Sequence, residues 1–181
     1  MSNQNFSVAL LFDQSPAAVY EAVINPRAWW SEEIAGGTAK AGDVFDYHFE
    51  DIHRAKMKLT ESVPDKRVVW HVLENEFKPG LFGEAAAGHV KGDGFENDKA
   101  EWVDTHVVFD IIKENDKTRL RFTHDGLVPD YECYDVCING WKHYIQESLY
   151  SLITTGQGKP NKTGRPMTVN EEQFNAAGGN M

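Results

Sequence analysis

The fold is most constrained by an alternating strand pattern over residues 117–127, which one long helical pattern over residues 130–155 follows. In the first stretch Leu120, Phe122 and His124 alternate with polar residues, and a glycine turn comes next. Successive side chains of a strand point to opposite faces, so this stretch has one apolar face. The helical pattern is long enough to span a small domain. We therefore predict a sheet that curls around this closing helix, with any functional site in the space between them.

The closing helix has acidic residues near its start and one apolar stripe along its length. The acids Asp130, Glu132 and Asp135 suit the positive end of the helix dipole. Gly156 is the predicted end of the helix. Gly140 costs about 1 kcal/mol relative to Ala in mid-helix, which favours a role in letting another backbone or a bulky ring approach closely. The apolar stripe consists of Tyr134, Cys137 or Ile138, Trp141, Ile145, Leu149 and Leu152.

The composition indicates one domain with a large aromatic core and an acidic surface. The 181 residues are 41% hydrophobic and include five Trp and ten Phe, which favours large buried aromatic clusters. The net charge of -10 argues against a nucleic-acid backbone or an anionic membrane surface as the main partner. No stretch approaches the ~18 apolar residues that cross a bilayer, and the first residues lack the pattern of a secretory signal. We expect a cytoplasmic location and no membrane insertion.

The first half of the chain predicts one strand, two short helices and a group of strands. Residues 6–12 form the first strand. Ser15 suits the N-cap and Pro16 the first position of a helix that ends before Pro26. Residues 27–33, which include a Trp pair, predict a second short helix. Further strands are predicted at 44–50, 54–60, 68–74, 102–113 and 118–124. Their alternation is typical of an antiparallel sheet with one buried face.

One segment interrupts the strands. Residues 77–99 are rich in Gly, Ala and charge, and they are too long for an ordinary hairpin. We predict a mobile loop, with a short helical turn near residues 83–87, that is a plausible gate to the interior.

The C-terminal residues are polar and follow the predicted end of the closing helix. We therefore divide the chain into a domain over residues 1–156 and a tail over residues 157–181. Within the tail, Thr168 and Glu171 match the spacing of a capping box. This match predicts a short helix over residues 169–177.

Several short motifs occur in a fixed order between residues 6 and 156. They are Ser15 to Tyr20 with Trp29 and Trp30, residues 107–111, residues 118–127, and Gly140 with Trp141. This order resembles the START-like (SRPBCC) superfamily, and within it the branch related to the activator of the heat-shock chaperone ATPase. The resemblance implies an α+β helix-grip fold, with a curved antiparallel sheet of six to seven strands wrapped around the long C-terminal helix and two short helices after the first strand.

The resemblance also implies an internal cavity, which binds an apolar small molecule in many relatives. Inner-face side chains could line such a cavity, or the same rings could fill the interior to native density. The candidate lining residues are Trp30, Phe45, Tyr47, Phe49, Met57, Trp70, Phe109, Phe122, His124, Cys137, Trp141 and Ile145.

Catalytic, cofactor and metal motifs are not evident in the sequence. There is no Gly-x-Ser-x-Gly elbow, phosphate loop or dinucleotide fingerprint, and no tight His or Cys spacing typical of a metal site. We therefore expect no cofactor and no metal. Cys133 and Cys137 lie four residues apart, where a helix holds Cβ atoms too far apart for a disulfide, so we expect two reduced thiols.

Three functional hypotheses follow. The first is non-enzymatic binding of an apolar or aromatic, lipid-like small molecule in the cavity. The second, from the resemblance alone, is a chaperone-associated interaction protein of the stress response. The third is a cavity enzyme of the cyclase or hydrolase type, which requires an inward-facing ionisable group such as His124, Asp104 or Glu147. His124 is open to two interpretations, a polar group at the cavity mouth or a structural residue with its hydrogen bonds satisfied.

Overall fold

The computed structural model describes residues 5–50, 52–77, 101–131 and 133–172. The predicted loop over residues 77–99 lies outside these ranges, apart from the backbone of Phe77, and so does its helical turn. In the described part of the chain, no helix has both the length and the apolar character required to cross a bilayer.

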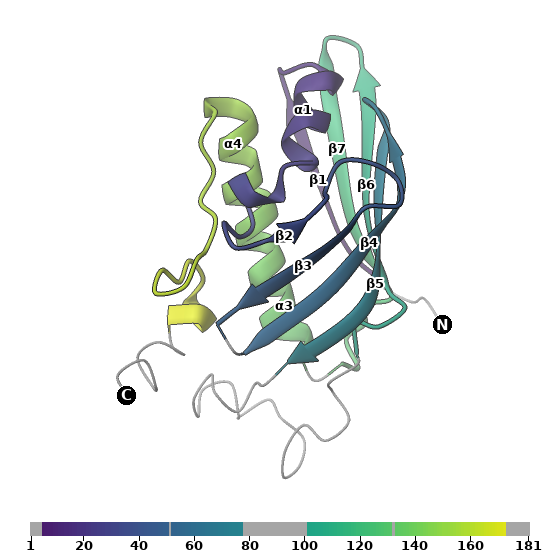
Figure 1. The fold of residues 1–181 in the computed structure, drawn as a ribbon. Coiled ribbons are helices and arrows are strands. Elements are labelled where there is room, and N and C mark those ends of the chain that lie inside the picture. Colours follow the sequence, from purple (N-terminus) through teal and green to yellow (C-terminus); the bar gives the residue numbers. More distant parts are fainter. Residues whose placement is uncertain (1–4, 51, 78–100, 132, 173–181) are drawn as a thin grey trace.

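Seven antiparallel strands form a single sheet that curves around the long C-terminal helix (Figure 1). The order across the sheet is β1-β7-β6-β5-β4-β3-β2, so β1 and the short β2 are its edges. The strands are β1 Phe6–Phe12, β2 Ala35–Gly36, β3 Val44–Phe49, β4 His53–Val63, β5 Arg67–Phe77, β6 His106–Glu114 and β7 Lys117–Asp125. The predicted α+β helix-grip fold is confirmed, and the alternation that predicted it separates a core face from an outer face.

The sixth strand begins later than the sequence pattern predicted. Residues 101–104 form a turn, and β6 starts at His106 rather than at residue 102. Asp104 has a positive φ of 65°, a conformation that breaks an extended strand. As a result Trp102 leaves the sheet and packs into the core, where it is 3% exposed.

The first helix, α1 Pro16–Val23, begins as predicted. The backbone N–H of Ala18 donates to the side-chain oxygen of Ser15 over 3.2 Å, which is an N-cap bond. The helix packs between the sheet and the end of the C-terminal helix (Figure 1).

The prediction of a second helix over residues 27–33 is wrong in its extent. The structure has a single 3₁₀ turn, η1 Pro26–Ala28. The backbone N–H of Glu32 instead donates to the carbonyl oxygen of Asn161 over 2.9 Å. This bond draws the chain away from a helical path.

The C-terminal helix is continuous but changes its winding. It consists of α3 Tyr134–Trp141, the π-helical segment η4 Lys142–Leu149 and α4 Tyr150–Thr155, so its predicted start at residue 130 is four residues early. Four of its buried residues, Cys137, Trp141, Ile145 and Leu149, are spaced by four. In an α-helix that spacing drifts by about 40° per step. The wider π turn reduces the drift and keeps Ile145 and Leu149 facing the sheet.

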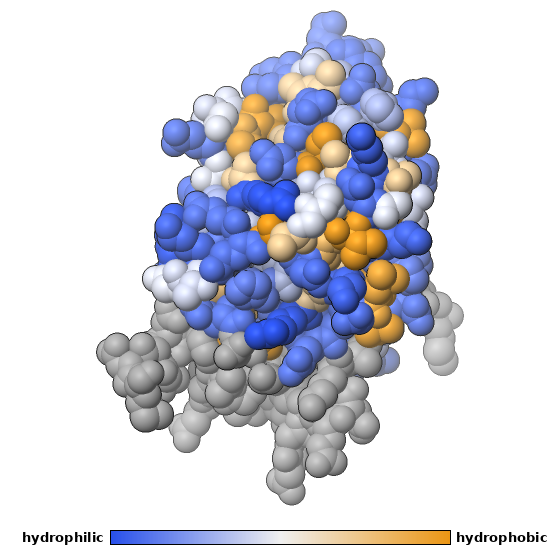
Figure 2. Space-filling model, in the orientation of Figure 1, coloured by the Kyte–Doolittle hydropathy of each residue, from blue (hydrophilic) through white to orange (hydrophobic). Residues whose placement is uncertain are grey.

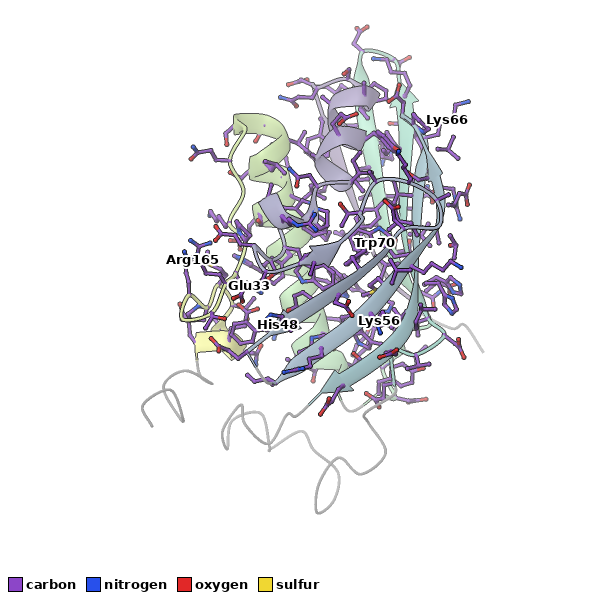
Figure 3. The ribbon with its side chains drawn as sticks, viewed as in Figure 1. Glu33, His48, Lys56, Lys66, Trp70 and Arg165 are labelled. Carbon is purple, nitrogen blue, oxygen red and sulfur yellow. The ribbon has the colours of Figure 1, made fainter. Side chains whose placement is uncertain are left out.

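Large aromatic rings fill the space between the sheet and the helix. Trp29 and Trp30 each stack on Trp70, with ring centroids 6.1 and 5.8 Å apart. Trp70 is fully buried near the middle of the sheet (Figure 3). Phe109 and Phe122 extend the cluster along β6 and β7 with an edge-to-face contact. The centre of the grip is therefore packed with side chains.

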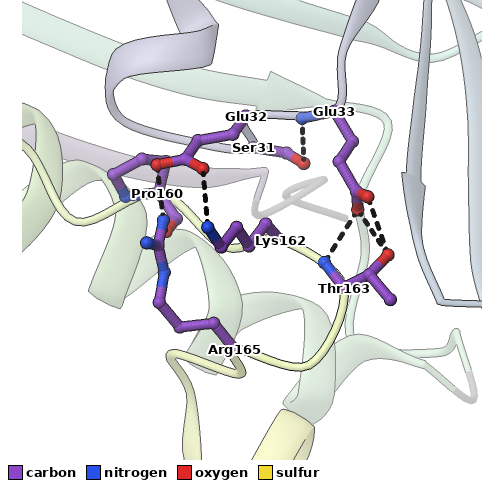
Figure 4. A network of polar contacts seen from close by, with 7 residues as sticks. All are labelled: Ser31, Glu32, Glu33, Pro160, Lys162, Thr163 and Arg165. Atoms are coloured by element: carbon purple, nitrogen blue, oxygen red, sulfur yellow. Dashed lines mark hydrogen bonds and ion pairs between the residues drawn. The ribbon is translucent and has the colours of Figure 1, made fainter.

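The segment after Gly156 lies against the domain. Asn161 is fully buried, and its backbone N–H donates to the carbonyl oxygen of Trp30 over 2.9 Å. Figure 4 shows the polar contacts beside it, in which Glu32 pairs with Arg165 at 2.7 Å and the hydroxyl of Thr163 donates to Glu33 over 2.7 Å. The hydrogen bond from Arg165 lowers the pKa of Glu32. The division of the chain at residue 156 stays a prediction.

The capping box predicted near the C-terminus is present. The N–H of Glu171 donates to Thr168 Oγ1 over 3.2 Å, and the N–H of Thr168 donates to the Glu171 carboxylate over 3.0 Å. Residues 169–172 are helical. The rest of the predicted helix, residues 173–177, lies outside the described residues.

The prediction that Gly140 admits a close neighbour is wrong. A Cβ atom built there would meet no atom within 4 Å, whereas one at Gly158 would lie 2.2 Å from the carbonyl oxygen of Ala28. The close approach between segments is thus at Gly158, where the C-terminal segment crosses η1.

These two glycines give a prediction for stability. Gly140→Ala should raise the free energy of unfolding by about 1 kcal/mol, since it removes a helix-interior glycine without a clash. Gly158→Ala should lower it, because backbone must shift to admit the methyl group. Urea denaturation of both variants measures the two changes. A stabilised Gly158→Ala variant would contradict the close packing of the C-terminal segment.

Candidate functional site

A small recess lies between β3, β4, the long helix and the C-terminal segment. Its volume is about 50 Å³. Its lining residues are Trp30, Tyr47, Phe49, His53, Trp102, Val136, Cys137, Gly140, Trp141, Tyr144, Thr168, Asn170 and Glu171. That volume has room for a few water-sized groups, far below the ~300–1,000 Å³ of drug-sized pockets. The recess is therefore too small to enclose a whole lipid.

The predicted lining residues fall into two groups. Five of them border the recess, namely Trp30, Tyr47, Phe49, Cys137 and Trp141. The other seven are buried in the packed core away from it, namely Phe45, Met57, Trp70, Phe109, Phe122, His124 and Ile145. For those seven, ring-to-ring packing occupies the space that a larger cavity would need. Ligand binding by either group stays a prediction.

Several lining residues were missed because only the tertiary structure brings them to the recess. Trp102 was assigned to a strand, and Glu171 was assigned to a separate tail. The capping-box spacing was the one sequence signal for Glu171. It predicted that a helix starts there but not where in the fold that helix lies. Tyr144 also lines the recess, because it follows Trp141 by three residues on the same helix face.

Flat aromatic rings form most of the wall. Trp30 stacks on Tyr47 with ring centroids 4.0 Å apart and an interplanar angle of 16°. Trp141 contacts Trp30 at 5.1 Å and stacks on Trp102 at 5.7 Å. These contacts link the sheet, the helix and the turn before β6 into one rigid surface.

The polar part of the recess is centred on the carboxylate of Glu171. The hydroxyl of Tyr144 donates to it, with distances of 2.7 and 2.9 Å to the two oxygens. The side-chain amide of Asn161 donates to Glu171 over 3.3 Å and to the Tyr144 hydroxyl over 2.8 Å. The backbone N–H groups of Met167 and Thr168 add bonds of 2.7 and 3.0 Å. A carboxylate that is 6% exposed needs such donors to remain inside a protein.

This carboxylate affects the neighbouring phenols. Burial raises the pKa of Tyr47 and of Tyr144 above the ordinary value of 10.0, and the charge of Glu171 raises both further. Both hydroxyls therefore stay protonated over the whole physiological range and act as hydrogen-bond donors.

Two polar atoms of the lining have no hydrogen-bond partner among the described residues. They are the indole nitrogen of Trp102, which is a donor, and the side-chain oxygen of Asn170, which is an acceptor. Buried polar atoms without partners are uncommon. A polar ligand or water in the recess would satisfy them.

His124 is a structural residue with both ring nitrogens engaged. The indole N–H of Trp141 donates to its Nδ1 over 3.0 Å, so the proton lies on Nε2, which donates to the hydroxyl of Thr105 over 2.8 Å. Burial lowers the pKa of His124 to about 3. This bond network ties β7 to the long helix.

The other candidate catalytic groups point elsewhere. The side chain of Asp104 is 83% exposed and pairs with His71 at 3.0 Å. Glu147 is 59% exposed and pairs with His143. The three candidates for the cavity enzyme therefore do not converge on one site.

The cysteines are unbridged and buried. The neighbouring Cys137 and burial raise the pKa of the Cys133 thiol well above its ordinary value, so it is a poor nucleophile at neutral pH. Within the described ranges, no group of three His, Cys, Asp or Glu side chains is arranged to hold a metal ion.

Comparison with known proteins identifies the family and the fold. Residues 13–154 match the family model of the Activator of Hsp90 ATPase homolog 1-like protein. A search of curated proteins found no match. The fold is similar to the Aha1 dimer from Colwellia psychrerythraea, with a TM-score of 0.61, 21% identity and coverage of 85% of this chain and 98% of that chain.

Two further solved structures share the fold at lower identity. A protein from Mesorhizobium loti has a TM-score of 0.54 and 15% identity, and the match covers 78% of this chain and 92% of that one. CalU16 from Micromonospora echinospora has a TM-score of 0.52 and 15% identity, with 97% of this chain and 86% of that chain covered.

The buried histidines predict how stability depends on pH. Burial lowers the pKa of His124 to about 3 and that of His53 to about 4, from an ordinary value of 6.5. The unfolded chain therefore binds protons that the folded chain excludes as the pH falls below about 6.5. Stability should fall with decreasing pH, by up to about 1.4 kcal/mol per pH unit for each histidine. In urea denaturation, His124→Gln should show a shallower slope below pH 6.5, and a slope equal to that of the parent would contradict the burial of a neutral His124.

The contact between Tyr144 and Glu171 gives a second prediction. Tyr144→Phe should lower the free energy of unfolding by about 1–3 kcal/mol, because it leaves a buried carboxylate one donor short. Tyr150→Phe is the matched control, since Tyr150 is 42% exposed and outside the recess. Hydrogen exchange at residues 167–172 should also accelerate in Tyr144→Phe alone. Unchanged exchange would show that Tyr144 does not hold this segment.

Proposed function

The chain belongs to the Activator of Hsp90 ATPase homolog 1-like family, and we propose that its helix-grip domain binds a small molecule through an apolar or aromatic group in the recess. The observation that carries the proposal is an aromatic recess in which one donor and one acceptor have no partner in the part of the chain that the structure describes. Binding sites for small molecules combine apolar walls with a few placed polar atoms in this way.

The packed centre of the grip limits what the recess can accept. Trp70, Phe109 and Phe122 occupy the interior beside it, so the ligand would not extend into the centre of the grip. The ligand's buried part would then be a single ring or head group. A larger, lipid-like molecule would require the C-terminal segment to move away from Tyr144.

A binding test can use Gly140 because its missing side chain leaves space beside the recess. A library of small aromatic and head-group compounds is screened by the shift in melting temperature, since a ligand that prefers the folded state raises it. Native mass spectrometry of protein purified from its own source identifies any ligand already bound. Both measurements should find at least one ligand in the unaltered protein.

Gly140→Leu should then lower the affinity for that ligand by roughly tenfold or more, and tenfold corresponds to about 1.4 kcal/mol. Asn139→Leu is the matched control, because it adds the same side chain to the exposed face of the same helical turn. Equal weakening by both variants would place binding outside the recess. A screen and a native spectrum without any ligand would remove the proposal.

A second candidate is a chaperone-associated role, which is favoured by the family description alone. The face seen in Figure 2 is mostly hydrophilic, with separate apolar patches among charged residues, and such a surface is typical of transient contacts. If this role holds, the purified protein should raise the ATPase rate of an Hsp90-class chaperone. An unchanged rate at saturating protein would count against it.

A further inference from the structure

We infer that the recess recognises a methylated ammonium head group, so that its ligand is an organic cation. The inference rests on the proposed function, since it requires that the recess binds a small molecule. It adds the chemical class of the part that enters.

The charge of the recess favours a cation. Among the lining residues that the structure describes, Glu171 is the one acidic residue, and none is Lys or Arg. His53 also borders the recess, and burial lowers its pKa to about 4, so it is neutral at physiological pH. The whole chain carries a net charge of -10. The carboxylate charge of Glu171 would repel an anionic ligand and attract a cation.

The second argument is the aromatic wall. Trp30, Trp102, Trp141 and Tyr47 border the recess and are within stacking or tilted contact of one another. Aromatic rings attract cations through their electron-rich faces, and Trp does so most strongly. Rings grouped around a buried carboxylate are an arrangement suited to a desolvated organic cation.

The third argument separates a methylated ammonium from a primary one. The Glu171 oxygens already accept hydrogen bonds from Tyr144, Asn161, Met167 and Thr168. A primary ammonium has three N–H donors, which is more than the side-chain oxygen of Asn170, the lining acceptor without a partner among the described residues, can satisfy. A quaternary ammonium has none, and it is attracted by the carboxylate charge through space. The volume of about 50 Å³ also suits a compact head group, with the rest of the ligand outside the recess.

The test compares choline with 3,3-dimethyl-1-butanol, the analogue in which a neutral tert-butyl group replaces the trimethylammonium group. The two have nearly the same shape, so the difference in affinity measures the effect of charge. At constant ionic strength, tryptophan fluorescence titration should show choline binding about five- to thirtyfold more tightly, the range that cation–π attraction supplies. Glu171→Gln should lower this ratio by at least about twofold, because it removes the attraction of the carboxylate and keeps the shape, while the aromatic rings retain part of the preference.

Glu172→Gln is the matched control, since it removes the same charge from the adjacent, exposed residue. It should leave the choline preference unchanged. Gly140→Leu should lower the affinity for both compounds by a similar factor. That result would locate both compounds in the recess, even if Glu171→Gln loosens the C-terminal segment.

The outcomes separate this inference from the proposed function. Equal affinity for the two compounds in the unaltered protein would overturn the cation inference and leave the proposed function in place. A choline preference that is the same in Glu171→Gln as in the unaltered protein would also overturn it. If neither compound binds but another ligand from the screen does, the inference is wrong and the proposed function stands. If nothing binds at all, both are wrong.

Discussion

Tryptophan rings from three distant segments pack against one another between the sheet and the long helix. Trp30 follows η1, Trp70 lies in the middle of β5, and Trp141 lies where the helix changes from α to π winding. Burial of these large rings supplies apolar contact that no single segment could make alone. The long helix is fixed on the sheet by this cluster and by the bond from Trp141 to His124. The positions of β1, α1 and the C-terminal segment depend on that arrangement.

The same packing explains why the recess is small and why it lies at one end of the grip. Rings fill the centre, and the recess lies to one side of them, where the long helix faces β3 and the start of β4. At that end the C-terminal segment brings a carboxylate, Glu171, into a half-apolar environment. The carboxylate remains there because Tyr144, Asn161 and backbone N–H groups donate to it. A charged group is thus held in a wall that consists mostly of aromatic rings.

Sequence patterns predicted the elements whose signal is local. The alternation of β3 and β7 and the N-cap at Ser15 follow from side-chain period and capping chemistry, and the structure has them. Predictions that depended on distant partners were less accurate. The helix predicted over residues 27–33 does not form as predicted. There the backbone N–H of Glu32 donates a hydrogen bond to the carbonyl oxygen of Asn161, which lies far away in the sequence. Trp102 is buried because residues 101–104 form a turn, whereas the sequence pattern predicted a strand from residue 102.

The sequence by itself determined the helix-grip fold, because periodic apolar faces allow few ways to bury a sheet and one long helix together. It also determined an aromatic interior, since that follows from residue type. The tertiary structure decided how much of the interior stays open and which polar groups face it. Those properties depend on sub-ångström packing between segments such as α3 and residues 161–171, and no local pattern encodes the distance between side chains that meet only after folding.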